Sequence, residues 1–279
     1  MKALIAGALA GLLLTADAAS AQDSPIQADK IILVGDSTTA VGSGWGGAFC
    51  DRHVLSALAC VNLGRQGRST STYRAEGSWD LALNEMATPG YQTVWVLIQF
   101  GHNDQPGKRS STDLATRFPE NLRAYVAEAR ARGARPVLLT PLTRRHFKGG
   151  QLQNTLVPWA DAVRAVAAET GTPLIDLNAS SADLVQRLGA MEAARLSPGS
   201  PPPSFEANLR AGNTPPTPPA ATPPPLPHGH HVEDFDYTHL GPEGAAVIAA
   251  LVARDLIPVA PDLTPVSYTH LTLPTTERV

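Results

Sequence analysis

The stretch Ile31-Ile32-Leu33-Val34-Gly35-Asp36-Ser37 decides the fold class of this chain. Its consecutive apolar residues, most of them β-branched, predict a strand that is buried on both faces, as the strands of parallel sheets are. The strand ends at Gly35 and leads directly to Ser37. Because open α/β sheets bind ligands at the carboxyl ends of their strands, we expect the Ser37 hydroxyl to lie at a functional edge of a sheet.

Further apolar runs repeat this pattern along the chain, at residues 60–63, 94–100, 136–140 and 173–177. Helix-like stretches accompany them, at residues 45–58, 113–132, 157–169 and 180–194. Gly241-Pro242-Glu243 begins a last helix that should run to about Leu256, since proline is favoured in the first helical turn. Strands that alternate with helices predict an α/β fold: a three-layer α/β/α sandwich with a mainly parallel sheet.

Both ends of the chain differ from the rest. Lys2, the apolar residues 3–14 and Ala19-Ser20-Ala21 form the pattern of a secretory signal peptide, too short to span a bilayer. We expect residues 1–21 to be removed and the mature protein to be secreted or periplasmic, without stable membrane association. Residues 266–279 resemble translated adapter sequence and are expected to be non-native, which leaves one domain at 22–265.

A proline-rich segment interrupts this domain, with twelve prolines between Pro198 and Pro227. Few large apolar residues accompany them, so the sequence predicts a disordered insertion at 198–227 that builds no packed structure. The segment ends shortly before Asp236 and could lengthen the rim of an active site. A tolerated surface insertion is the simpler interpretation.

Charge and cysteine content narrow the functional classes. The net charge is −3 and no basic block is present, so nothing indicates nucleic-acid binding. The two cysteines, Cys50 and Cys60, lie close together in a chain that we expect to be exported. A small-loop disulfide is the favoured interpretation, and two buried thiols are the alternative.

A group of histidines and acids follows the proline-rich segment. Its members are His228, His230, His231, Glu233, Asp234 and Asp236. Such a group could bind a divalent metal ion, but it lacks the ligand spacing of a helix or strand. A solvated linker is therefore favoured, and we expect neither a metal nor an organic cofactor.

Three residues can supply nucleophilic catalysis. A serine hydroxyl is a weak nucleophile unless a neighbouring base takes its proton. Asp236 and His239 are three residues apart, so one loop can bring a base and its orienting carboxylate to Ser37. His102 is a rival base, although it lies beside a candidate oxyanion donor rather than at turn spacing from a carboxylate, which favours a structural role. The Gly-x-Ser-x-Gly elbow of α/β-hydrolases is absent.

The negative charge that develops in acyl transfer needs preorganised hydrogen-bond donors. The candidates are the backbone N–H of Ser37, the backbone N–H of Gly67, and the side-chain amide of Asn103. Gly67 has no side chain to prevent a close approach to substrate. Gly64 is a rival for this glycine role.

Four ordered blocks resemble the SGNH (GDSL) hydrolase superfamily, and specifically its rhamnogalacturonan acetylesterase branch. They are Gly35-Asp36-Ser37-Thr38-Thr39, Asn62-Leu63-Gly64-Arg65-Gln66-Gly67-Arg68-Ser69, Gly101-His102-Asn103-Asp104 and Asp236-Tyr237-Thr238-His239. The resemblance implies a flavodoxin-like hydrolase fold with Ser37 as nucleophile, His239 as base and Asp236 as its partner. It also implies that Gly67, rather than Gly64, completes the oxyanion hole with Asn103 and the Ser37 N–H.

The same resemblance implies a secreted serine esterase that removes acetyl groups from plant cell-wall polysaccharide such as rhamnogalacturonan or pectin. A general lipase, thioesterase or short-chain esterase is the alternative, because the same catalytic parts serve many acyl groups. A non-catalytic carbohydrate-binding protein is a further alternative, which the intact set of catalytic residue types counts against.

Contacts to a uronate polymer have several candidates. Arginine side chains could meet its carboxylates, and the candidates are Arg68, Arg74, Arg144 and Arg145. Trp79 and Phe147 could stack on sugar rings, although core packing explains these aromatic residues equally well.

Overall fold

A parallel sheet of five strands lies at the centre of the structure, a computed structural model that describes residues 28–217 and 234–263. The strand order is β2-β1-β3-β4-β7, and every neighbouring pair is parallel. The strands are β1 (Ala28–Gly35), β2 (Ala59–Asn62), β3 (Tyr91–Gln99), β4 (Arg135–Leu139) and β7 (Leu174–Ile175). The predicted parallel sheet is confirmed. The predicted signal peptide and the tail at 266–279 lie outside the described residues.

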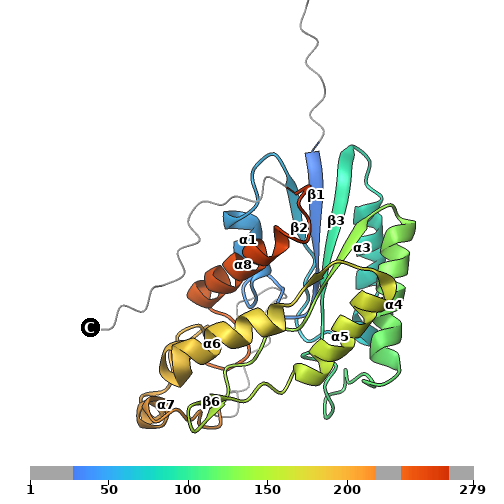
Figure 1. Cartoon of the computed structure of the whole chain (residues 1–279). Helices are drawn as coiled ribbons and strands as arrows, with labels where there is room; N and C mark the ends of the chain where they lie inside the picture. The colour runs from blue at the N-terminus through green and yellow to red at the C-terminus, as the bar shows by residue number, and fades with distance from the viewer. Residues whose placement is uncertain (1–27, 218–233, 264–279) are drawn as a thin grey trace, which may run out of the picture.

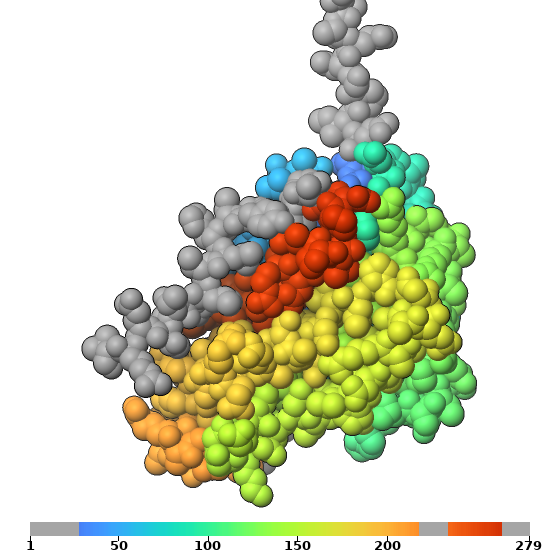
Figure 2. Space-filling view, viewed as in Figure 1, coloured from blue at the N-terminus to red at the C-terminus, as the bar shows by residue number. Residues whose placement is uncertain are grey.

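Helices cover both faces of the sheet (Figure 1). One face carries α1 (Gly46–Arg52), α6 (Leu177–Ala194) and α8 (Pro242–Leu256). The other carries α2 (Thr70–Ala75), α3 (Ser78–Met86), α4 (Arg117–Ala131) and α5 (Val157–Thr170). Figure 2 shows α8 lying along α6 on the outside of the first face. The predicted three-layer sandwich is therefore present.

The side chains of β1 point alternately into two hydrophobic cores, one on each face of the sheet. Ile31 and Leu33 point into the core beneath α1 and α8, whereas Ile32 and Val34 point into the core beneath α3 and α4. All four side chains are fully buried. A strand that is apolar on both faces suits an interior position in a covered sheet, and β1 lies between β2 and β3.

The strand order indicates where on the sheet a ligand crevice is expected. From β1 the chain passes to β2 on one side and then to β3 on the other side of β1, so the connections reverse direction between β1 and β3. Ligand crevices of open α/β sheets form at the carboxyl ends of strands where this reversal occurs. Gly35 and Gln99 pair there, so the loops that carry Ser37 and Asn103 leave the sheet side by side.

Short elements account for most differences from the sequence-based expectation. The helix predicted over 45–58 ends at Arg52, and α2 and α3 were not expected. Ser69 caps α2 through a capping box with Thr72, a local signal too short to show a helical period. The antiparallel hairpin of β5 (Phe147–Lys148) and β6 (Gln151–Leu152) turns at Gly149 and Gly150, which have φ values of 56° and 78°.

The prediction that residues 198–227 build no packed structure is wrong for their first part. This part forms η1 (Pro203–Phe205) and α7 (Glu206–Arg210). Leu209 is buried among Val185, Phe147 and Tyr237, and Phe205 packs against the same cluster. Two apolar side chains one helical turn apart, Phe205 and Leu209, pack into this cluster, and the prolines at 198–203 precede the α-helix, where no N–H is needed. Residues 218–227 lie outside the described residues.

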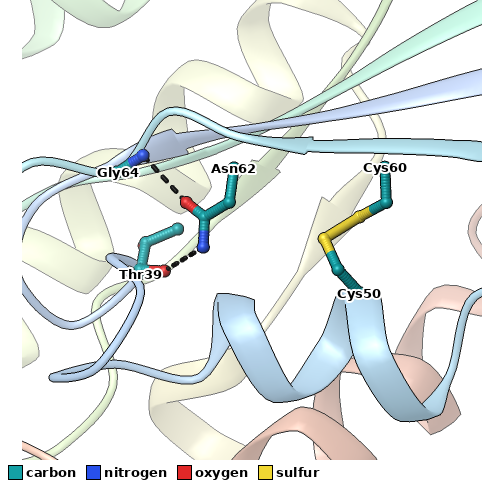
Figure 3. The surroundings of a disulfide bond; sticks show 5 residues. All are labelled: Thr39, Cys50, Cys60, Asn62 and Gly64. Carbon is teal, nitrogen blue, oxygen red and sulfur yellow. Dashed lines mark hydrogen bonds between the residues drawn. A yellow bond between two sulfur atoms is a disulfide. The ribbon is translucent and has the colours of Figure 1, made fainter.

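A disulfide joins helix α1 to the edge strand β2 (Figure 3). The Cys50 and Cys60 sulfur atoms are bonded, with their Cα atoms 5.6 Å apart. The small-loop disulfide favoured from the sequence is thus formed in the structure. In the described part of the chain, no helix combines the length and apolar character that crossing a membrane requires.

Replacing both Cys50 and Cys60 by serine should lower the free energy of unfolding by about 2–3 kcal/mol, because the bridge closes a short loop in the unfolded chain. Urea unfolding monitored by circular dichroism measures the difference. A reducing agent should lower the stability of the wild type toward that of the double variant and leave the variant unchanged. Equal free energies for wild type and variant would contradict a stabilising bridge.

Candidate active site

Asp36 shapes the loop that presents the nucleophile candidate Ser37. Its carboxylate Oδ1 accepts hydrogen bonds from the Thr38 backbone N–H at 2.9 Å and the Thr38 hydroxyl at 2.8 Å. Its carbonyl accepts the backbone N–H groups of Thr39 and Ala40. The backbone directly after β1 is therefore held in one tight turn that includes Ser37.

Two polar side chains, one on β3 and one on β2, form hydrogen bonds with the same loop. Gln99 Oε1 accepts hydrogen bonds from the Thr39 hydroxyl and the Trp45 indole N–H, both at 2.7 Å. Asn62, at the end of β2, donates to the Thr39 carbonyl and accepts the Gly64 N–H, both at 2.9 Å (Figure 3). Sequence reasoning missed the role of Gln99, although a polar residue inside the apolar run 94–100 was the available signal.

Ser37, His239 and Asp236 form a continuous hydrogen-bonded chain. His239 Nε2 lies 3.0 Å from Ser37 Oγ, and His239 Nδ1 lies 2.6 Å from Asp236 Oδ2. A carboxylate only accepts hydrogen bonds, so Nδ1 carries the imidazole proton and Nε2 is left as the acceptor for the serine hydroxyl. The structure brings together the three residues that the sequence singled out, in the geometry that activates a serine.

The Asp236 carboxylate is kept ionised by its partners. Burial pushes the pKa of Asp236 upward, but the hydrogen bond and charge of His239 outweigh it, together with backbone N–H groups. These N–H groups belong to Thr238 and His239, and both donate to Oδ1 at 2.6 Å. The net result is a pKa of about 2, so Asp236 remains negative over the working range of a histidine base.

Arg145 donates hydrogen bonds to the backbone of the loop that carries Asp236 and His239. It is almost fully buried, and its Nη2 donates to the carbonyl oxygens of Asp236 at 3.0 Å and His239 at 2.6 Å, and to Ser197 Oγ at 3.1 Å. Burial lowers the pKa of Arg145 to about 10, so the guanidinium stays charged at neutral pH. Arg145 is therefore a support for the loop rather than a contact for the uronate polymer considered from the sequence.

The three candidate oxyanion donors lie on the segments that follow β1, β2 and β3. Asn103 is buried, and its Nδ2 donates to the Arg68 carbonyl at 3.2 Å, which brings the amide to the segment that contains Gly67. Within the described part of the chain, the backbone N–H groups of Ser37 and Gly67 donate to no other group. The rival Gly64 has its N–H engaged by Asn62. The available donors are therefore Ser37, Gly67 and Asn103.

His102 occupies a different environment from His239. It is buried, and its Nδ1 lies 3.6 Å from Oδ2 of Asp36, the residue that shapes the nucleophile loop. Burial lowers the pKa of His102 despite the opposing charge of Asp36. The buried position beside Asp36 favours the structural role expected for His102.

Two of the candidate substrate arginines are engaged by acids of the same protein. Arg68 pairs with Glu76 at 2.6 Å, and Arg74 makes a two-pronged contact with Glu128 at 2.7 and 3.1 Å. Arg74 also lines a cavity of about 440 Å³ together with Trp79, and none of the Ser37, Asp236 and His239 side chains lines it.

Arg144 differs, because it contacts the active site and has no carboxylate partner in the described residues. Its Nε donates to the Thr238 hydroxyl at 3.1 Å, and its Nη1 donates to Gln105 at 2.5 Å. Trp79 and Phe147 are both buried in apolar cores rather than placed to stack on a sugar.

The predicted acid and histidine group is described only in part. His228, His230, His231 and Glu233 lie outside the described residues. Residues 28–217 and 234–263 contain no group of three or more histidine, cysteine or acidic residues arranged to hold a metal ion.

The sequence profile of the GDSL-like lipase/acylhydrolase family matches residues 33–247, which carry the whole of this constellation. The chain belongs to this family. Its resemblance to the rhamnogalacturonan acetylesterase branch is confirmed by two relatives from Bacillus subtilis (strain 168). Rhamnogalacturonan acetylesterase RhgT is 36% identical over 62% of this chain and 73% of its own length. Probable rhamnogalacturonan acetylesterase YesY is 32% identical over 54% and 70%, respectively. This family member is therefore a carboxylic ester hydrolase.

Solved structures share the fold. The protein YXIM of Bacillus subtilis superposes with a TM-score of 0.61 at 21% identity, over 85% of this chain and 58% of that longer chain. Axe2, an acetylxylan esterase from Geobacillus stearothermophilus, superposes with a TM-score of 0.50 at 17% identity, over 84% of this chain and 95% of its own. These likenesses support the sandwich architecture.

Replacing Asp236 by asparagine should remove a contribution to the free energy of unfolding that is present at neutral pH and is lost in acid. The pKa of Asp236 falls from 3.8 to about 2 on folding, so its contribution is fully present above pH 3.8 and is lost as the pH falls through about 2. The difference in unfolding free energy between wild type and Asp236→Asn should therefore shrink over this interval. Urea unfolding at a series of pH values measures it, and a difference that stays constant down to pH 2 would contradict the assignment.

Proposed function

We propose that this protein is an exported serine esterase that removes acetyl groups from plant cell-wall polysaccharide, of the rhamnogalacturonan or pectin type. The observation that carries the proposal is the hydrogen-bonded chain from Ser37 through His239 to Asp236. The names of the two curated relatives support acetyl esters of rhamnogalacturonan as substrate. The Cys50–Cys60 disulfide supports an oxidising compartment, in agreement with the signal-peptide pattern at residues 1–21.

The proposed reaction is acyl transfer in two steps. Ser37 Oγ attacks the acetyl carbonyl carbon while His239 Nε2 takes the hydroxyl proton, and Asp236 stabilises the imidazolium that forms. The carbonyl oxygen becomes negative and accepts hydrogen bonds from Ser37, Gly67 and Asn103. The ester bond then breaks, and His239 returns the proton to the departing sugar oxygen. This leaves an acetyl group on Ser37.

The second step repeats the first with water. His239 takes a proton from a water molecule, whose oxygen attacks the acetyl carbon of the acylated serine. The same donors stabilise the same oxyanion, so one set of fixed groups serves both halves of the reaction. Collapse of this intermediate releases acetate and returns the proton to Ser37. This chemistry draws only on groups of the protein and on water.

Acetate release from acetylated rhamnogalacturonan, pectin and xylan tests both the nucleophile and the substrate class. Ser37→Ala should reduce the rate by at least about 10³-fold, because removal of a triad nucleophile leaves only binding and oxyanion stabilisation. Ser56→Ala, at an exposed serine, is the matched control and should keep the wild-type rate. We expect the wild type and Ser56→Ala, but not Ser37→Ala, to release acetate from a pectic polymer.

Three other outcomes would change or overturn the proposal. Release from xylan but not from the pectic polymers would keep the esterase chemistry and replace the substrate. Hydrolysis of octanoyl esters in preference to acetyl esters would favour a general lipase or short-chain esterase. An unchanged rate in Ser37→Ala would overturn the proposed nucleophile.

A further inference from the structure

The loop after β3 folds back so that Lys108 reaches the side chain of Asn103. The loop closes through a hydrogen bond from the Thr112 N–H to the Asp104 carbonyl at 2.9 Å, and Gly107 provides a turn with φ of 84°. Lys108 Nζ donates to the His102 carbonyl at 3.0 Å and to Asn103 Oδ1 at 3.1 Å. The ammonium group therefore lies against one of the candidate oxyanion donors.

This contact decides which way the Asn103 amide faces. An asparagine amide has a donor end and an acceptor end of nearly the same shape, and only hydrogen bonding distinguishes them. The ammonium of Lys108 can only donate, so the atom that faces it must be Oδ1. Nδ2 then lies on the other side, where one of its hydrogens goes to the Arg68 carbonyl. The second Nδ2 hydrogen is left for an oxyanion.

The opposite amide orientation would be costly while Lys108 is present. Rotation by half a turn would place the Nδ2 hydrogens against the ammonium and Oδ1 against the Arg68 carbonyl. One new contact would set donors against donors, and the other would set an acceptor against an acceptor. Both existing hydrogen bonds of Asn103 would also be lost, at a residue that is only 8% exposed. The rotated amide would also present no donor to the substrate.

The charge of Lys108 adds to this effect. Among the described residues, no carboxylate lies within ion-pairing distance of its ammonium group, so no salt bridge neutralises it. A hydrogen bond from a cation to Oδ1 polarises the amide and strengthens the Nδ2 donor. A positive charge beside Asn103 therefore lies where negative charge develops in the proposed reaction.

We propose that Lys108 is a positioning residue of the ester hydrolysis, which fixes the Asn103 amide with Nδ2 directed at the oxyanion. The inference rests on the proposed function, because it requires an oxyanion bound by Asn103. It assigns no proton transfer and no direct substrate contact to Lys108. Its effect should appear in the chemical step and should act through Asn103.

Steady-state hydrolysis of p-nitrophenyl acetate, a neutral ester, tests this role in the full chain. Lys108→Met keeps the length of the side chain and removes its donor and its charge. We expect kcat to fall by about 10–100-fold, somewhat less than deletion of an oxyanion donor, and KM to stay within about twofold. Lys108→Arg, which also can only donate, should recover most of the loss. Lys148→Met, at an exposed lysine, is the matched control and should behave as wild type.

A double-mutant cycle with Asn103→Ala separates positioning from a general structural effect. Without the amide, Lys108→Met should lower kcat by less than about twofold further. The same large loss in both backgrounds, or wild-type kcat in Lys108→Met, would overturn the inference. Ser37→Ala, assayed in parallel, distinguishes the two proposals. An active Ser37→Ala contradicts the proposed function, whereas an inactive Ser37→Ala beside a fully active Lys108→Met contradicts only the role of Lys108.

Discussion

The parallel pairing of β1 with β3, which sets Gly35 beside Gln99, is the constraint on which the active site depends. The loops that carry Ser37 and Asn103 leave the sheet from these two strand ends. The fit there is tight, since a Cβ atom on Gly35 would lie 2.4 Å from the Thr39 hydroxyl oxygen and 2.6 Å from the Gln99 carbonyl. A shift of one residue would turn the Gln99 side chain to the other face and release the nucleophile loop.

Two cations that have no carboxylate partner among residues 28–217 and 234–263 contact the loops around this edge. Arg145 donates to carbonyl oxygens on the loop of Asp236 and His239, and Lys108 donates to the loop and amide of Asn103. A cation that donates to carbonyl oxygens constrains the backbone of the loop that carries them. These hydrogen bonds connect each loop to a cation of the protein itself, and preorganised contacts of this kind are what oxyanion stabilisation in the proposed reaction requires.

The sheet and the three central residues could be predicted because their signals are local. Apolar runs mark the strands, and the types and order of Ser37, Asp236 and His239 mark the chemistry. Gln99 and Arg145 were missed as supports because their partners lie 52 to 94 residues away in sequence. Contacts of this kind depend on the tertiary fold, and no periodicity in the chain reports them. The ordered part of the proline-rich segment was missed for the same reason, since its few apolar side chains matter only beside the cluster that they fill.

Covalent labelling of the nucleophile tests the central claim most directly. A fluorophosphonate reacts with an activated serine, with loss of fluoride, to leave a stable phosphonylated residue whose position peptide mass spectrometry identifies. The account predicts modification of Ser37 in the wild type and a much slower reaction in His239→Ala, because the serine then has no base. Modification of a different residue, or a rate at Ser37 that does not depend on His239, would contradict it.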